Sequence, residues 1–259
     1  VLLESRMCEF VGSGYSQLIG PLVPAEVNAA NLRLGHEVYE RILGLRPTLA
    51  LVNEQAYSSS LIQHYLDAGY RATVMEWDNP AHNHPEWNPE WRYLPQLACG
   101  QEGEEVPVIW NKSVAFQKFQ RYAHGELELD EYLEYMERHT AESLRAFPIY
   151  GNDAEIFGFR PGRYETETAV RDDEWTRIRL LFETLRADKR FEFVRPSAVL
   201  DLLTAPGAGN RLHLESPEVP VPVKKQDKYN LTRWSVTGRN DLAINTACWT
   251  PPRRRPGTT

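Results

Sequence analysis

The sequence predicts an α/β fold built on a parallel sheet. Short apolar runs rich in β-forming residues alternate with longer amphipathic runs over most of the chain. Strands that alternate with helices of about 10–18 residues are typical of βαβ units, whose strands lie parallel. The length of 259 residues suits one α/β barrel or two smaller domains. No glycine fingerprint of a Rossmann or P-loop site accompanies the expected strands.

Six strands are expected from the apolar runs. The second is nearly all apolar from Leu49 to Val52, which indicates burial on both faces. From Glu76 to Pro107 the pattern changes to a loop rich in Trp, Pro, His and Asn. The expected strands are residues 8–11, 49–52, 72–75, 108–110, 149–151 and 191–194.

Helices are expected between these strands. The first begins at Pro24 and ends at Gly44, with an apolar stripe of Val27, Leu34, Val38 and Ile42. Later helices are expected over residues 58–68, 113–122, 130–147, 171–187 and 196–203. Three regions follow from this pattern: a barrel over residues 1–205, a C-terminal irregular segment packed on the barrel over 206–250, and a disordered tail over 251–259.

Composition excludes several classes of partner. The net charge of −7 and the confinement of dense basic residues to Arg253–Arg255 argue against nucleic-acid binding. No apolar run approaches the roughly 20 residues that cross a bilayer, so no membrane partner is expected.

Three widely spaced cysteines form no CxxC pair, and their odd number favours reduced thiols in a cytoplasm.

Carboxylates follow three of the expected strands. Glu54 comes after residues 49–52, Glu76 after 72–75, and Asp153 and Glu155 after 149–151. In parallel α/β folds the active site lies at the carboxyl ends of the strands. Glycoside hydrolysis needs two such groups, one to attack or activate water and one to protonate the leaving oxygen. The alternative is that these acids are solvated loop residues or helix caps.

Aromatic side chains accompany these acids at or near the strand ends. Flat indole and phenol rings pack against the C–H faces of pyranose sugars, so Tyr57, Trp77 and Trp110 are candidate substrate contacts. Burial in the core is the competing interpretation. Trp87 and Trp91 lie in the same loop region.

The pair His82 and His84 is a weak candidate for metal ligation, because a third ligand and a rigid element are missing nearby. No metal and no cofactor are therefore expected. A metal-dependent polysaccharide deacetylase-like enzyme, which needs one Asp and two His, is an alternative that rests on this pair.

Three segments together resemble glycoside hydrolase family 57. Residues 8–15, which include Glu9 and Tyr15, resemble the family's second conserved region, which lines the cleft. Residues 51–57 resemble the nucleophile region, and residues 153–158 match the pattern D-x-E-x-F-G. The last match is the most specific. The resemblance also extends to residues 228–241, which look like the end of an uncharacterised branch of the family and would either contribute to the cleft or clamp the barrel.

The resemblance implies a retaining enzyme that acts on α-glucans by double displacement, as an α-amylase or a 4-α-glucanotransferase. Glu54 would be the nucleophile and Asp153 the general acid/base. It implies an incomplete parallel (β/α)7-type barrel, because the family's first conserved region, a His-containing strand, has no counterpart and the first βα unit is expected to be missing. The expected substrate-binding residues are Glu9, Tyr15, Tyr57, Trp77, Trp110, Glu155 and Phe157.

Two features leave the function open. Val52 and Asn53 stand where the family usually has Trp and Pro before the nucleophile. Hydrolase and transferase differ in how the acceptor subsites hold sugar or water, which the sequence does not decide. A non-catalytic carbohydrate-binding relative is a further alternative, and the sequence makes no prediction of the oligomeric state.

Overall fold

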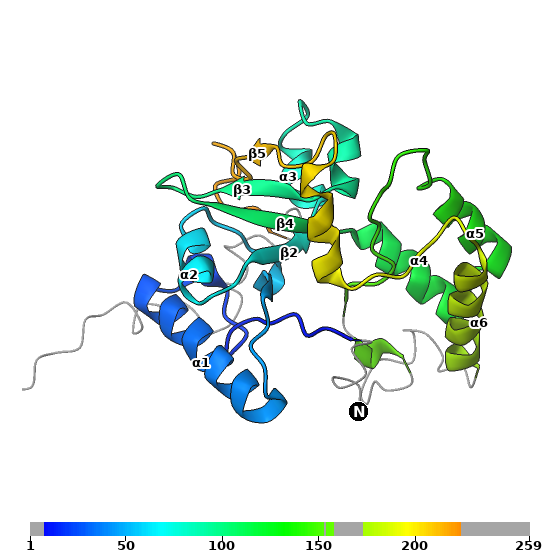
Figure 1. Cartoon of the computed structure of the whole chain (residues 1–259), viewed down its shortest axis with the longest axis horizontal. Helices are drawn as coiled ribbons and strands as arrows, with labels where there is room; N and C mark the ends of the chain where they lie inside the picture. Colours follow the sequence, from blue (N-terminus) through cyan, green and yellow to red (C-terminus); the bar gives the residue numbers. More distant parts are fainter. Residues whose placement is uncertain (1–7, 153, 158–172, 224–259) are drawn as a thin grey trace, which may run out of the picture.

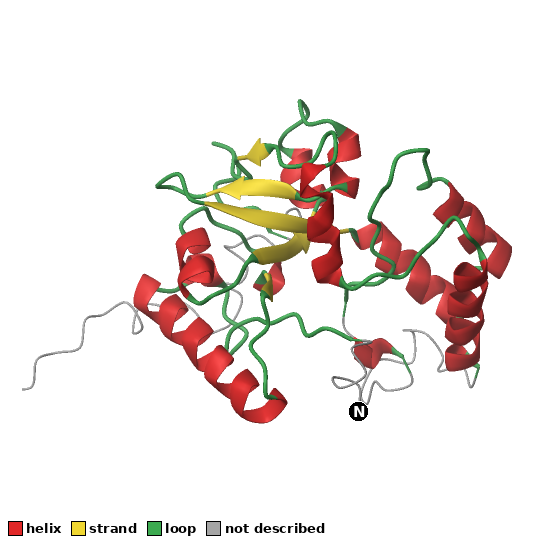
Figure 2. Cartoon of the chain, viewed as in Figure 1, coloured by secondary structure: helices red, strands yellow, loops and turns green. Residues whose placement is uncertain are grey.

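The computed structural model describes residues 8–152, 154–157 and 173–223. Its strands form one five-stranded sheet in the order β1-β2-β4-β3-β5, seen near the centre of Figure 2. The strands are β1 (Leu49–Leu51), β2 (Ala72–Glu76), β3 (Gln96–Cys99), β4 (Glu105–Asn111) and β5 (Arg211–Leu212).

The sheet is mixed, with parallel pairing dominant. β1, β2 and β4 run parallel, as the alternation of strands and helices predicted. β3 is antiparallel to β4 and lies inside residues 76–107, where a loop was expected. The expectation of a loop throughout residues 76–107 is wrong here, because β3 forms within it and a short turn, closed by the bond from Gly100 N to Glu104 O, reverses the chain between β3 and β4. β5 then pairs parallel to β3.

Six α-helices and five 3₁₀ helices occur in the described residues. The α-helices are α1 (Ala25–Leu43), α2 (Leu61–Asp67), α3 (Asp78–His82), α4 (Ser113–Ala123), α5 (Leu129–Glu137) and α6 (Glu174–Ala187). The 3₁₀ helices are η1 (Gly20–Leu22), η2 (Asn53–Gln55), η3 (Pro89–Tyr93), η4 (Ala154–Ile156) and η5 (Pro196–Thr204). Figure 1 shows α4, α5 and α6 grouped to one side of the sheet.

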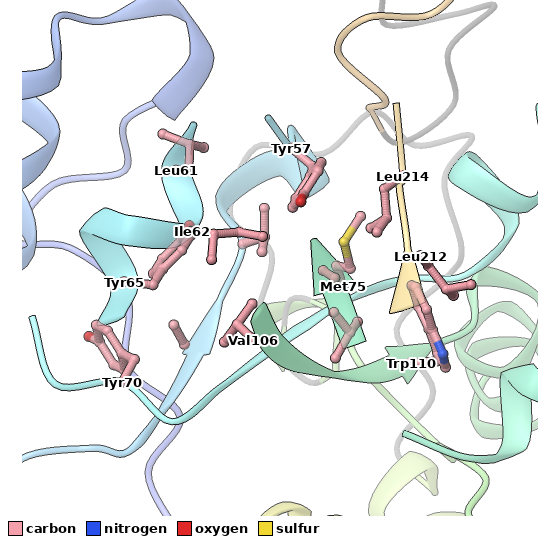
Figure 3. Close-up of a cluster of buried hydrophobic side chains, with 14 of the residues drawn as sticks. Tyr57, Leu61, Ile62, Tyr65, Tyr70, Met75, Val106, Trp110, Leu212 and Leu214 are labelled. Carbon is pink, nitrogen blue, oxygen red and sulfur yellow. The ribbon is translucent and has the colours of Figure 1, made fainter. Parts of the chain in front are cut away.

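Both faces of the sheet are covered by apolar side chains. On one face Met75, Val106 and Trp110 belong to one apolar cluster with Ile62 of α2, and Figure 3 labels these four residues. On the other face Leu49, Ala72 and Ile109 pack against Val199 and Leu200 of η5, the yellow helix in Figure 1. A separate cluster joins α4, α5 and α6. The sheet is thus covered by apolar packing on both faces.

Three expected strands are absent. Residues 149–151 and 191–194 are loop, and residues 8–11 contain no strand, although Gly12 forms a single bridge with Ala50 at the edge of β1. Ile149 and Tyr150 pack against the cluster of α4, α5 and α6, and Gly151 O accepts the side chain of Asn111 at the end of β4. Apolar β-forming residues alone do not distinguish a strand from a loop, and residues 192–194 are exposed.

The helix expected over residues 130–147 is shorter. α5 begins with a capping box, in which Glu128 and Glu131 each bond the other's backbone N–H. It ends at Glu137, whose carbonyl accepts from the Thr140 hydroxyl at 2.7 Å. A threonine side chain that captures a helical carbonyl competes with continuation of the helix. α6 likewise begins at Glu174, three residues after its expected start.

The face of α1 that is buried is not the one expected. Val27, Leu34 and Ile42 are exposed, whereas Asn31 and His36 are buried. The polar face is buried because residues 13–20 pack on it. Asn31 accepts from Ser16 N at 2.8 Å and donates to Ser16 O at 3.0 Å.

At Gly35 of α1 the chain approaches so closely that a Cβ would lie 2.9 Å from the carbonyl carbon of Gly14. Tertiary contacts with this segment therefore override the amphipathic pattern of the helix.

The described part of the C-terminal segment contacts the sheet. β5 pairs with β3, and Leu212 and Leu214 belong to the same apolar cluster as Met75. Tyr57 N donates to Pro222 O at 3.0 Å. Residues 224–259, which include 228–241 and the expected tail, lie outside the described residues.

Candidate active site at the strand ends

Glu54 lies directly beyond β1 in an uncommon backbone conformation. Its φ is 53°, and that of Gln55 is 57°. Non-glycine residues in the left-handed region cost about 1–3 kcal/mol each and cluster at functional sites. Two in succession, at the carboxyl end of a buried strand, mark this turn as the structural centre of the candidate site.

Hydrogen bonds from the N-terminal segment hold the turn. Gln17 Nε2 donates to Glu54 Oε1, so the carboxylate is oriented by a residue of the N-terminal segment. Ser13 Oγ donates to Asn53 Oδ1 at 2.6 Å. Glu54 itself is half-buried, which leaves its carboxylate accessible to a ligand.

Glu76 ends β2 and is almost completely buried. Its Oε1 accepts the backbone N–H of Ser113, at the start of α4, at 2.7 Å. Its Oε2 is buried and meets no hydrogen-bond partner among the described residues. Burial is the main cause that raises the pKa of Glu76, and the charge of Asp78 adds to it, whereas the hydrogen bond from Ser113 and the charge of Lys112 oppose the shift; the net pKa is about 7. Glu76 is thus a carboxyl group that titrates near neutral pH.

Asn111 ends β4 and fixes the segment that leads to Asp153. Its Nδ2 donates to Gly151 O at 2.8 Å, and its Oδ1 accepts from Lys112 N at 2.9 Å. A Cβ at Gly151 would lie 2.4 Å from Asn111 Oδ1. Glycine is therefore needed at this position for the close approach.

The predicted acid/base is outside the part of the chain that can be described. Asp153 and the side chain of Glu155 lie outside the described residues. Gly151 and Asn152 just before them are described, and they lie at the same sheet edge as Asn111. The structure therefore brings Glu54, Glu76 and the segment just before Asp153 to one edge of the sheet. This edge is formed by the carboxyl ends of β1, β2 and β4, which are adjacent and parallel.

The predicted aromatic contacts are buried. Trp77 and Trp110 belong to one apolar cluster, with ring centroids 5.0 Å apart; Figure 3 labels Trp110. Tyr57 is also buried, and its hydroxyl donates to Cys99 O at 3.3 Å. Phe157 packs within the cluster of α4 and α6. Packing accounts for all four side chains in this conformation, and a substrate contact for them stays a prediction.

The two candidates from the N-terminal segment differ from each other. Tyr15 is exposed and free to meet a ligand. Glu9 accepts the backbone N–H of Ser197 at 2.8 Å, where η5 begins. This contact is structural, because a carboxylate at that position satisfies a helix N–H that otherwise lacks an acceptor.

The histidine pair is part of the loop packing. His84 stacks on Trp87 with a centroid separation of 4.3 Å and contacts Glu86 at 3.0 Å. His82 is the last residue of α3. Within residues 8–152, 154–157 and 173–223 no group of three or more His, Cys, Asp or Glu that could hold a metal is found.

Three polar residues of the site were not predicted as site residues: Gln17, Gln55 and Asn111. Glu76 was noted as a strand-end acid without an assigned role. Asn111 and Gln55 also follow predicted strands closely, so a search for amides as well as acids at strand ends would have found them. Gln17 becomes part of the site through a contact over 37 positions, which no local pattern reveals.

Comparison with known proteins identifies the family. The model of glycosyl hydrolase family 57 matches residues 1–208. The chain belongs to this family. Family members act on α-glucans as glycosyl hydrolases or transferases. A search of curated proteins found no match.

Three solved structures of family 57 type show the same fold. The 4-α-glucanotransferase of Thermococcus litoralis is 19% identical with a TM-score of 0.65, and the match covers 84% of this chain and 32% of that one. An α-amylase of Thermotoga maritima is 14% identical with a TM-score of 0.60, covering 82% and 51%. The branching enzyme of Pyrococcus horikoshii is 15% identical with a TM-score of 0.60, covering 90% and 51%.

The likeness confirms the predicted fold class, since these relatives are (β/α)7 barrels. The chain spans between a third and a half of the length of these three structures. No helix in the described ranges is long and apolar enough to cross a membrane.

Proposed function

We propose that this member of family 57 is a retaining enzyme acting on α-glucans, with Glu54 as nucleophile and Asp153 as general acid/base. The observation that carries the proposal is the left-handed turn at the end of β1, in which Glu54 is oriented by Gln17. A second carboxylate, required by the reaction, follows Gly151 in the chain, where Asn111 anchors the backbone.

In the proposed mechanism Glu54 attacks the anomeric carbon of the bound sugar. Asp153 donates a proton to the departing glycosidic oxygen, so that a glycosyl-enzyme ester forms on Glu54. Asp153 then accepts a proton from the incoming hydroxyl, which attacks the ester and releases the sugar with its configuration retained. The two carboxyl groups of such a pair lie about 5–5.5 Å apart.

The nature of the incoming hydroxyl separates hydrolysis from transfer. Water gives shorter glucans, and a sugar hydroxyl gives longer ones. Chromatography of products formed from a single maltooligosaccharide distinguishes the two, because transfer yields oligomers longer than the starting material. Oligomer lengthening would assign the chain to the transferases.

The odd cysteine count supports a cytoplasmic location for either activity.

Replacement of each carboxylate, with azide as an external nucleophile, tests the assignment. Glu54→Ala should lose activity on an activated α-glucoside by about a thousandfold or more. Azide should restore turnover by entering the space of the carboxylate and should give the β-glycosyl azide. Asp153→Ala should form the glycosyl-enzyme with an activated leaving group, and azide should then give the α-glycosyl azide. Product configuration by NMR reads the role of each residue.

Glu142→Gln is a control, since Glu142 is exposed and lies in the loop that follows α5. It should retain the activity of the unaltered chain. Full activity of Glu54→Ala without azide would refute the nucleophile assignment. Binding of maltooligosaccharide by the unaltered chain without turnover would instead indicate a non-catalytic carbohydrate-binding relative.

A further inference from the structure

Gln55 occupies the place where the hydrogen-bond ladder between β1 and β2 stops. Val52 N donates to Val74 O at 3.1 Å, as expected for parallel strands. In a continuing parallel ladder the next bond would run from Glu76 N to Val52 O. Instead Val52 O accepts Gln55 N at 3.0 Å, and Glu76 N donates to the side-chain Oε1 of Gln55 at 2.7 Å.

One residue thus replaces both partners of the missing ladder bond. The backbone N–H of Gln55 donates to Val52 O, and its side-chain oxygen accepts the N–H of Glu76 on β2. Neither of these polar groups is left without a partner, which would cost about 1–3 kcal/mol for a buried group. This exchange of hydrogen-bond partners lets the chain leave the sheet one residue after β1 ends, in a turn of two left-handed residues.

We infer that Gln55 is a positioning residue for the reaction, which fixes the Glu54 carboxylate by anchoring the left-handed turn to β2. The inference rests on the proposed function of Glu54. Gln55 is buried, so it acts through the backbone that it shares with Glu54 rather than by touching substrate.

The anchor also links Glu54 to the other side of the site. Glu76, whose N–H is bound by Gln55, accepts Ser113 N at the start of α4 through its side chain. Asn111, which pairs with Glu76 in the sheet, holds Gly151 two residues before Asp153. Loss of the Gln55 anchor would therefore change the position of Glu54 relative to the Asp153 segment.

Two substitutions separate positioning from folding. Gln55→Met keeps the volume of the side chain and removes its acceptor. Gln55→Gly also removes the acceptor, but it relieves the left-handed backbone strain at this position. Both should lower kcat by tenfold or more with KM changed less than about threefold, because small misplacement of a reacting group costs up to about a hundredfold in rate.

The amide of Glu76 reports the anchor directly. Hydrogen exchange should be slow at this amide in the unaltered chain and faster in both variants, while exchange at Val74 on the same strand stays slow. Thermal unfolding is measured alongside. A purely structural role predicts unchanged kcat in the folded variants at a temperature well below the midpoint, which would overturn the inference.

The two hypotheses fail differently. If Glu54→Ala is inactive and both Gln55 variants keep the kcat of the unaltered chain, the positioning role is wrong and the nucleophile assignment stands. If Glu54→Ala is active, the nucleophile assignment is wrong, and the positioning role of Gln55 is lost with it.

Discussion

At the scale of single residues, Glu76 has the smallest exposed fraction of the carboxylates that the structure describes. It is 1% exposed, against 3% for Glu174. The backbone N–H of Ser113 stabilises one oxygen, and the other has no partner in the described residues. Burial without full hydrogen bonding disfavours the charged form, which is why the pKa rises to about 7.

The raised pKa predicts a pH-dependent stability. The native state holds the Glu76 proton up to about pH 7, whereas the unfolded chain loses it near 4.5. Between these values the native state binds more protons, so the free energy of unfolding falls as pH rises. Full ionisation costs at most about 3 kcal/mol. Glu76→Gln should remove this loss and be more favourable relative to the unaltered chain at about pH 8 than at about pH 5.

Chemical denaturation at the two pH values measures the difference for Glu76. Glu142→Gln serves as the exposed control, and its stability should run parallel to that of the unaltered chain. Parallel behaviour of Glu76→Gln as well would show that Glu76 is already ionised throughout the range.

At the scale of elements, Arg177 joins α6 to the end of α4. Its Nε donates to Tyr122 O and its terminal nitrogen to Leu127 O, both at 2.8 Å. Its guanidinium carbon also lies 4.6 Å from the centre of the Tyr122 ring. Tyr122 O lies in the last turn of α4, where a cation is favourable, and Leu127 O lies in the loop before α5. Arg177 therefore holds both the end of α4 and this loop against α6.

Arg177→Met should therefore destabilise the chain by about 2–4 kcal/mol, since two hydrogen bonds from a charged donor are lost. Arg179→Met is the control on the same helix, because Arg179 is exposed and meets Glu183 only at 3.9 Å. Its effect should stay within about 0.5 kcal/mol. Equal effects of the two substitutions, measured by urea unfolding, would contradict the role of Arg177.

The elements also show how far a local pattern determines structure. The helices at residues 113–122 and 25–43 form where expected, because spacing, capping and glycine stops are local properties. The prediction of which face of α1 is buried was wrong, because Asn31 and Gly35 contact residues 14–16 of the N-terminal segment rather than an apolar core. The periodicity of apolar residues shows that a helix has an apolar face, but it does not show which face of the helix packs against the rest of the chain.

At the scale of the whole molecule, η5 closes the second face of the sheet. Val199 and Leu200 cover Leu49 and Ile109, across about 90–150 positions of sequence. Glu9 holds the start of η5 by accepting Ser197 N. A contact across 188 positions of the sequence thus holds the helix that covers the strands of the candidate site.

Glu9 was predicted to bind substrate, and its contact with Ser197 yields a test of the two roles. If it holds η5, Glu9→Ala should lower the free energy of unfolding by about 1–2 kcal/mol, and Glu9→Gln, which keeps an acceptor, by less. KM should then stay unchanged in Glu9→Gln. A raised KM in Glu9→Gln with unchanged stability would favour the substrate contact instead.

The sequence alone determined the α/β class, the burial of Leu49, Ala50 and Val52, and the carboxylate that follows β1, because alternation, apolar runs and strand-end acids are local features of the sequence. Leu51 is exposed, against the expectation of burial on both faces. Motif spacing around residues 153–158 also led to the family, which the match over residues 1–208 confirmed. Only the tertiary structure decided that β3 reverses, that Trp77 and Trp110 are buried, and that Gln17 and Gln55 hold Glu54. These features depend on contacts between distant segments, whose geometry no local pattern contains.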